Sequence, residues 1–173
     1  MDDITTNLST ILNGCLRRRI KREIDQLIEL EICNDNIVWL KPNINHQHND
    51  LTTYTISFYN KQHNNRYYEF VLSLDYPFKS PKLIINNKPY SHYLKIQTNQ
   101  FKNALLKYNF IDCFCCETIL CGNNWTPHYQ ITNILTEVDK FKNICREIAY
   151  RIIINAIKLK YLVYDINIAE WLF

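Results

Sequence analysis

The stretch that decides the fold is YPFKSPK, which occupies residues 76–82. A proline has no backbone N–H, so Pro77 and Pro81 cannot donate to a neighbouring strand, and an extended segment that reaches them stops pairing and turns. The rings of Tyr76 and Phe78 are available to anchor this turn or to contact a partner. The motif therefore predicts a fixed turn between two strands.

Extended segments flank this turn on both sides. They are rich in β-branched and aromatic residues, which favour strands. The predicted strands are residues 37–44, 51–59, 67–74 and, after the prolines, 82–85. The connections between the first three are polar and of hairpin length. This pattern predicts a four-stranded antiparallel meander.

Two long segments have the apolar periodicity of helices. The first, residues 12–31, carries apolar side chains at three- and four-residue spacing: Leu16, Ile20, Ile24, Leu27 and Ile28. The second begins at Pro127 and has a continuous apolar stripe: Ile131, Ile134, Leu135, Val138, Phe141, Ile144, Cys145 and Ile148. It continues through Ile153, Ile157 and Tyr161 as one helix or two. A short helix is predicted at residues 99–107, built on Phe101, Leu105 and Leu106.

Length and composition narrow the classes of protein that the chain can be. Its 173 residues, 47% of them hydrophobic, are enough for one domain with a real core. We therefore expect a single domain over residues 1–173, with an insertion at about residues 86–108. The only glycines are Gly14 and Gly122, so the chain has no glycine-rich phosphate loop. A net charge of +3 is too small to indicate nucleic-acid binding.

The cysteines and the ends of the chain suggest its compartment. Seven cysteines, four of them between Cys113 and Cys121, are a poor layout for a disulfide framework and favour a reducing compartment. The first residues are acidic where a secretory signal would be basic. The most apolar run, residues 152–164, is interrupted by Lys158 and Lys160, so no membrane association is expected. We expect a cytoplasmic protein, with the nucleus as the alternative. The abundance of Asn and Ile is typical of an AT-rich genome such as that of a large DNA virus or a protist, and a viral protein would act in the host cytoplasm.

A second motif follows the meander. It consists of CETIL at residues 116–120 and WTP at residues 125–127. Together with YPFKSPK, it resembles the ubiquitin-conjugating enzymes, which carry Tyr-Pro-Phe-x-x-Pro-Lys, Cys-Leu-Asp-Ile-Leu and Trp-Ser-Pro in the same order. The resemblance covers about residues 16–148. It implies an α+β fold with an N-terminal helix, a four-stranded meander, an irregular cysteine-bearing segment and C-terminal helices.

The resemblance also implies a reaction and its residues. Cys116 would accept ubiquitin or a ubiquitin-like modifier as a thioester and pass it to a lysine of a protein substrate. Cys115 is the alternative nucleophile, because a register slip of one residue is easy in an irregular segment. The family's His-Pro-Asn motif is missing, and its nearest counterpart is Asn109, which would stabilise the oxyanion. Glu117, Asp112 and Glu137 are all candidates for orienting the attacking lysine, and the sequence does not choose among them.

Partners follow from the same resemblance, and no cofactor is implied. The family's first helix docks the activating enzyme, which places that partner on the basic side of residues 12–31. That basic side consists of Arg17, Arg18, Lys21 and Arg22. Phe78 and Pro127 match positions that contact ubiquitin ligases. Trp125 is expected to anchor the core under the cysteine segment.

Two other hypotheses remain open from the sequence. Without His-Pro-Asn, the chain could be an inactive variant of the same fold that acts as a binding module. A small zinc protein is the less favoured alternative, and it is supported by the cluster of Cys113, Cys115, Cys116 and Cys121. Cys113 and Cys116 have the spacing of a zinc knuckle, and Cys121 or His128 could complete the shell.

Overall fold

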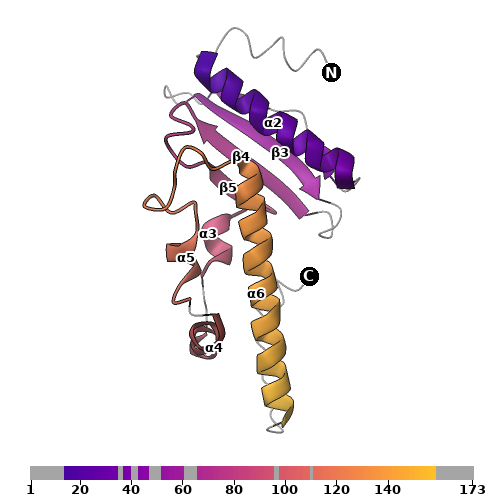
Figure 1. Cartoon of the computed structure of the whole chain (residues 1–173), viewed down its shortest axis with the longest axis vertical. Helices are drawn as coiled ribbons and strands as arrows, with labels where there is room; N and C mark the ends of the chain where they lie inside the picture. The colour runs from indigo at the N-terminus through magenta and orange to yellow at the C-terminus, as the bar shows by residue number, and fades with distance from the viewer. Residues whose placement is uncertain are drawn as a thin grey trace.

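The computed structural model describes residues 14–34, 37–39, 43–46, 52–60, 66–95, 98–109 and 111–158. It has an α+β architecture that combines one antiparallel sheet with two long helices (Figure 1). These helices are α2, Gly14–Asn34, and α6, Ile131–Lys158. The N-terminal helix, the antiparallel sheet and the helices after it confirm the predicted class and order of elements. No helix in these ranges is both long and apolar enough to cross a membrane.

The sheet is built around two long central strands, β3, Thr52–Asn60, and β4, Arg66–Ser73. The order of its strands is β1-β3-β4-β5-β6, and β2 also pairs with β3. The shorter strands are β1, Ile37–Trp39, β2, Asn43–His46, β5, Lys82–Ile85, and β6, Lys88–Pro89. All the pairings between them are antiparallel. The fourth predicted strand, residues 82–85, is therefore present with its predicted bounds.

The first predicted strand, residues 37–44, was wrong as a single element. The structure has β1 and β2 in its place, and they pair with successive parts of β3: Trp39 lies opposite Phe58, and Asn43 lies opposite Thr55. Pro42 falls between the two strands in the sequence and has no N–H to donate to a ladder. The prediction joined the two strands because it followed the β-branched and apolar residues and gave no weight to Pro42.

A tight hairpin joins β5 to β6. Asn86 and Asn87 adopt positive φ angles of 47° and 62°, a backbone region that asparagine tolerates better than most residues. The side chain of Asn86 accepts a hydrogen bond from the backbone N–H of Tyr67 on β4 at 2.8 Å. The short α3, Tyr90–Tyr93, follows β6 directly.

The core is one cluster of buried side chains to which the sheet, α2, α4 and α6 all contribute. Along β4 the side chains alternate between buried and half-buried, as expected for a strand with one face in the core. Tyr68, Phe70 and Leu72 point to that face. On α6 the buried members of the stripe are Ile131, Ile134, Val138, Phe141, Cys145 and Ile148, while Leu135 and Ile144 are partly buried. The helix is continuous through residue 158, but Ile153, which was predicted to continue the stripe, is 44% exposed and lies off it. Tyr161 lies outside the described residues.

The predicted insertion contains a helix, as expected. This is α4, Asn99–Asn109, which packs against α6 (Figure 1). Phe101 and Leu105 are buried, which confirms the apolar spacing. Leu106 is 47% exposed, so it lies beside the buried stripe of the helix and not on it.

The YPFKSPK turn is held through Tyr76, which is buried, while Phe78 projects outward and is 81% exposed. Glu23 lies on the buried side of α2, between Ile20 and Leu27, and is 0% exposed. Its Oε1 accepts hydrogen bonds from the Tyr76 hydroxyl at 2.5 Å and from Arg19 Nε at 2.7 Å. Burial, followed by the Glu23 carboxylate, raises the pKa of Tyr76, so its hydroxyl stays protonated and donates.

The same carboxylate also reaches α6. Glu23 Oε2 accepts the backbone N–H of Ile131, the first residue of that helix, at 2.9 Å. The first N–H groups of a helix have no partner within it, so Glu23 supplies the acceptor that Ile131 lacks. Arg19 also donates to the backbone oxygen of Tyr129 and lies 5.5 Å from the centre of the Tyr76 ring. One buried carboxylate therefore connects α2, the proline turn and α6.

We predict that Glu23→Gln lowers the free energy of unfolding by about 3 kcal/mol, because Arg19 and the Ile131 N–H lose a charged acceptor at a buried site. Urea denaturation followed by circular dichroism measures the loss. Glu29→Gln is the matched control, since Glu29 is an exposed acid on the same helix. Equal stability of the two variants would contradict the role assigned to Glu23.

Candidate functional site

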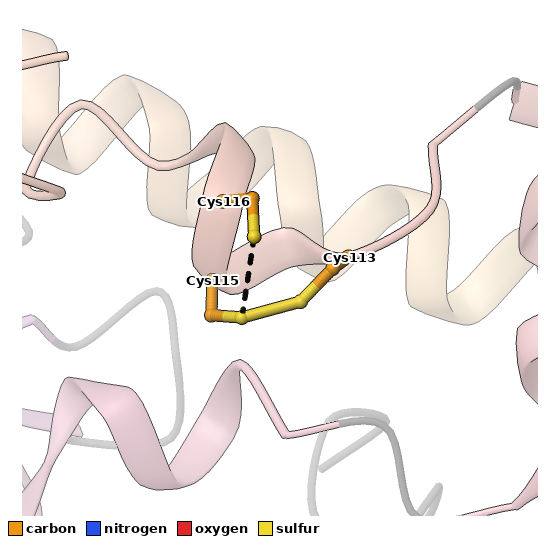
Figure 2. A group of neighbouring side chains, drawn as sticks. All are labelled: Cys113, Cys115 and Cys116. Atoms are coloured by element: carbon orange, nitrogen blue, oxygen red, sulfur yellow. Dashed lines mark hydrogen bonds between the residues drawn. A yellow bond between two sulfur atoms is a disulfide. The ribbon is translucent and has the colours of Figure 1, made fainter. Parts of the chain in front are cut away.

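The candidate site is the cysteine-bearing segment around α5, Phe114–Glu117 (Figure 2). Cys113 and Cys115 are joined by a disulfide that spans two residues of sequence. Cys116 is a free, exposed thiol, and its Sγ lies 3.9 Å from that of Cys115. The disulfide is local and joins no distant parts of the chain. It leaves Cys116 as the one of the two predicted nucleophiles that carries a free thiol.

The buried side chain of Phe114 anchors the segment in the core. This residue is 1% exposed, and its ring centre lies 4.5 Å from that of Phe141 on α6. The backbone N–H groups of Cys116 and Glu117 both donate to the Cys113 carbonyl, at 3.2 and 3.3 Å. A buried aromatic side chain next to exposed cysteines gives α5 a defined orientation, with its thiols toward solvent.

Asn124 holds the other side of the segment. Its side-chain amide donates to the backbone oxygens of Cys116 at 2.6 Å and of Thr118 at 3.1 Å. The carbonyl of the candidate nucleophile is thus tied to a residue eight positions later. The sequence pattern did not point to Asn124, because an asparagine after a glycine is typical of any turn.

Glu137, like Glu23, is a buried acid, and it supports the same segment from α6. Its oxygens accept the Thr118 hydroxyl at 2.5 Å and the Ile119 backbone N–H at 2.7 Å. Burial raises the pKa of Glu137, and these two hydrogen bonds act against that effect. Glu137, one of the three acids proposed to orient a lysine, therefore holds the chain after Cys116 in place.

A pocket of about 310 Å³ opens beside this segment. Glu117 and Glu137 both line it, together with Lys140, whereas Asp112 is exposed and lies outside the lining. Glu117 is exposed and directly follows Cys116. The structure thus brings two of the three candidate acids to one pocket, and Glu117 is the acid there with an exposed side chain.

The two sequence motifs meet in space through Trp125. Its indole Nε1 donates to the carbonyl of Pro77 at 2.7 Å, and its ring centre lies 6.2 Å from that of Tyr76. Trp125 is 9% exposed, which confirms its predicted role as a core anchor. Phe78 and Pro127, the two predicted ligase contacts, are both exposed. Phe78 directly follows Pro77, and Pro127 comes two residues after Trp125. They therefore lie at the same end of the molecule.

The basic side of α2 is exposed for the most part. Arg18, Lys21 and Arg22 are exposed, and Arg17 is half-buried. Arg18 Nε donates to the backbone oxygen of Gly14 at 3.1 Å. These side chains leave a basic surface on a helix whose opposite side is held in the core by Glu23.

The ligand set proposed for zinc differs from the cysteines that the structure brings together. The sulfurs of Cys113, Cys115 and Cys116 all lie within 4.8 Å of one another. Cys121 is half-buried and is not part of this group, and His128 Nδ1 lies 2.9 Å from the hydroxyl of Thr126. Three of the four cysteines of the predicted zinc cluster therefore come together, and Cys121 does not join them.

The sequence analysis did not single out two residues that anchor the fold, and one predicted site residue has a side chain outside the described part of the structure. Arg19 and Glu23 were not singled out, although an acid at the spacing of Ile20 and Leu27 is a signal of a buried carboxylate. Asn109, the proposed oxyanion donor, is the last residue of α4, and its side chain lies outside the described part of the structure.

Comparison of the chain with protein-family models, with curated proteins and with solved structures finds no match. The resemblance to ubiquitin-conjugating enzymes therefore depends on the quoted motifs and on the order of the elements.

We predict a definite order of thiol modification in the native protein. Among the cysteines whose side chains the structure describes, iodoacetamide without a reductant should label Cys116 first, while Cys145, which is buried and whose pKa burial raises to about 12, should react only after unfolding. Cys113 and Cys115 should react only after reduction of their disulfide. Mass spectrometry of tryptic peptides identifies each site. Rapid labelling of Cys115 in the untreated protein would contradict the arrangement.

Proposed function

We propose that the protein is a ubiquitin-conjugating-like transferase that carries ubiquitin or a ubiquitin-like modifier on Cys116. The observation that carries the proposal is an exposed, free thiol at Cys116 on a segment anchored to the proline turn through the bond between Trp125 and Pro77. The two motifs on which the resemblance depends are therefore parts of one contiguous structure.

The proposed chemistry has two steps. In the first, the Cys116 thiolate attacks the thioester of the activating enzyme, a new C–S bond forms at Cys116, and the thiolate of the activating enzyme leaves. In the second, a substrate lysine attacks that carbonyl, an amide bond forms, and Cys116 leaves as a thiolate while the amine loses a proton. A thiolate suits both steps, because it is a good nucleophile and a good leaving group.

Support for the second step comes from the pocket beside α5. Glu117 lines this pocket and directly follows Cys116, and its exposed carboxylate can orient the ammonium group of an attacking lysine and help it to lose a proton. We keep Asn109 as the proposed oxyanion donor. A positioned amide of this kind is worth roughly 3 to 4 kcal/mol of transition-state stabilisation.

The surfaces of the protein fit the partners that this reaction requires. The basic side of α2 is the proposed contact for the activating enzyme, and Phe78 and Pro127 are the proposed contacts for a ubiquitin ligase. The ring of Phe78 is 81% exposed and is therefore accessible to a partner, and aromatic side chains are enriched in the cores of protein interfaces.

We predict that Cys116→Ser either replaces a thiol-labile modifier adduct with a more stable oxyester or abolishes loading, because an alkoxide is a poorer leaving group than a thiolate. Incubation with activating enzyme, ATP and ubiquitin, followed by gel electrophoresis with and without thiol, measures the adduct. Cys121→Ser is the matched control and should load normally.

Each other outcome of this assay identifies an alternative. Loss of loading in Cys115→Ser with normal loading in Cys116→Ser would move the nucleophile by one residue. No loading of the fully reduced wild-type chain would reject the transferase and favour the inactive binding module.

We predict that joint neutralisation of Arg17, Arg18, Lys21 and Arg22 slows loading by about tenfold or more, with little change in melting temperature, because exposed charges act mainly on the rate of association. The control is a second quadruple variant with exposed lysines elsewhere neutralised. These are Lys82, Lys95, Lys102 and Lys107. Loading rates and thermal unfolding are measured for both. An equal loss of melting temperature and of rate in the first variant would mean that the aliphatic stems of these side chains support the core.

A further inference from the structure

The arrangement of Cys113, Cys115 and Cys116 goes beyond what a single nucleophile requires. A thioester carrier needs one thiol, yet three sulfurs gather on one turn of chain within 4.8 Å of one another (Figure 2). Cys115 and Cys116 are exposed, and Cys113 is half-buried. Phe114, which lies among them in sequence, is buried, so the turn is fixed to the core while its sulfurs face outward.

We propose that this cluster, once reduced, binds one thiophilic metal ion, such as Zn²⁺, through the three thiolates. Reduction consumes two equivalents of a thiol: the Cys113–Cys115 bond breaks, two protein thiols form, and the reductant becomes a disulfide. Binding of Zn²⁺ then releases three protons, one from each cysteine, because the thiolate is the metal ligand.

The spacing of the sulfurs fits such an ion. Zinc–sulfur bonds are about 2.3 Å long, so two thiolates on one tetrahedral ion lie roughly 3.8 Å apart. The sulfurs of Cys115 and Cys116 are 3.9 Å apart, which matches this value without any movement. The sulfur of Cys113 has to move from its bond with Cys115 to a similar separation. The Cα atoms of Cys113 and Cys115 are 5.4 Å apart, so both residues remain close to a common ion once their disulfide is reduced.

The surroundings suggest the kind of site. Three thiolates on an exposed turn leave the fourth position of a tetrahedral ion open to water or to an outside ligand, as in zinc sites with three protein ligands. Soft thiolates select Zn²⁺ or Cu⁺ over Mg²⁺ or Ca²⁺, which prefer oxygen ligands. Among the described residues, neither Cys121 nor His128 belongs to the group, so the site is not the knuckle that the sequence spacing indicates.

A bound ion would occupy the sulfur of Cys116. Metal binding and modifier loading would then exclude each other, a consequence that depends on the proposed function, whereas the metal site itself does not. The cluster would thus have two reduced states, one with a metal ion and one with a thiol ready for loading.

The test uses the full chain, reduced and kept free of oxygen, with Zn²⁺ as the probe in competition with a chromophoric chelator. We expect one Zn²⁺ per chain. Cys113→Ser, Cys115→Ser and Cys116→Ser should each weaken binding by more than about 100-fold, because loss of a direct ligand should exceed the 10- to 100-fold cost of outer-shell changes. Cys121→Ser is the matched control and should bind like the wild type. Co²⁺ should give the thiolate charge-transfer absorption of a sulfur-ligated site.

A second measurement on the wild type avoids any effect of substitution on folding. Zn²⁺ should slow alkylation of Cys113, Cys115 and Cys116 in the reduced chain, while Cys121 should react at an unchanged rate. Absence of a 1:1 complex, or equal weakening by Cys121→Ser, would overturn the proposal. Neither experiment uses a modifier, so failure of the metal site is distinguishable from failure of loading, which is assayed with chelator present.

Discussion

The buried carboxylate of Glu23 is the interaction on which the rest of the structure depends. It receives the Tyr76 hydroxyl, the Arg19 guanidinium and the Ile131 backbone N–H, which come from the proline turn, from α2 itself and from the start of α6. An ionised carboxylate at 0% exposure is stable only when donors replace the lost water. The cost of losing any one donor is therefore high, and the three segments keep a fixed relation.

The position of the cysteine segment follows from this relation. Tyr76 and Ile131 both donate hydrogen bonds to Glu23, and they belong to the proline turn and to α6. The segment that follows the cysteines contacts both of these elements. Between them, the indole of Trp125 donates to Pro77, and Glu137 on α6 accepts the Thr118 hydroxyl and the Ile119 N–H. Glu23 and Glu137 thus each accept one side-chain hydroxyl and one backbone N–H, and Glu23 accepts the Arg19 guanidinium as well. Glu23 thereby fixes the start of α6, and Glu137 fixes the chain just after Cys116.

The chemistry proposed for the cysteines follows from exposure. Cys145 lies on the buried stripe of α6, and burial raises its pKa to about 12, so it acts as a small apolar residue. Cys116 differs because Phe114 takes the buried position on its turn and leaves the cysteine outside. The same turn places Cys113 and Cys115 beside it, and this proximity supports a second use of the sulfurs. A thiol can form a thioester only where a partner can reach it, and a metal ion can bind only where several thiols converge.

The sequence by itself determined the elements whose pattern is local. The spacing of Leu16, Ile20 and Leu27 predicted α2, the prolines at 77 and 81 predicted the end of β4, and the apolar stripe after Pro127 predicted α6, because periodicity and missing N–H groups act within a few residues. The split into β1 and β2 was missed, although Pro42 is a local signal for it, because the β-branched residues on either side favour a strand. Three contacts were decided only by the tertiary structure. They are the cluster of the three sulfurs, the hydrogen bonds of Glu23 with Tyr76 and Ile131, and the hydrogen bond of Trp125 with Pro77. Those contacts join residues up to 108 positions apart, and a local pattern carries no information about such distances.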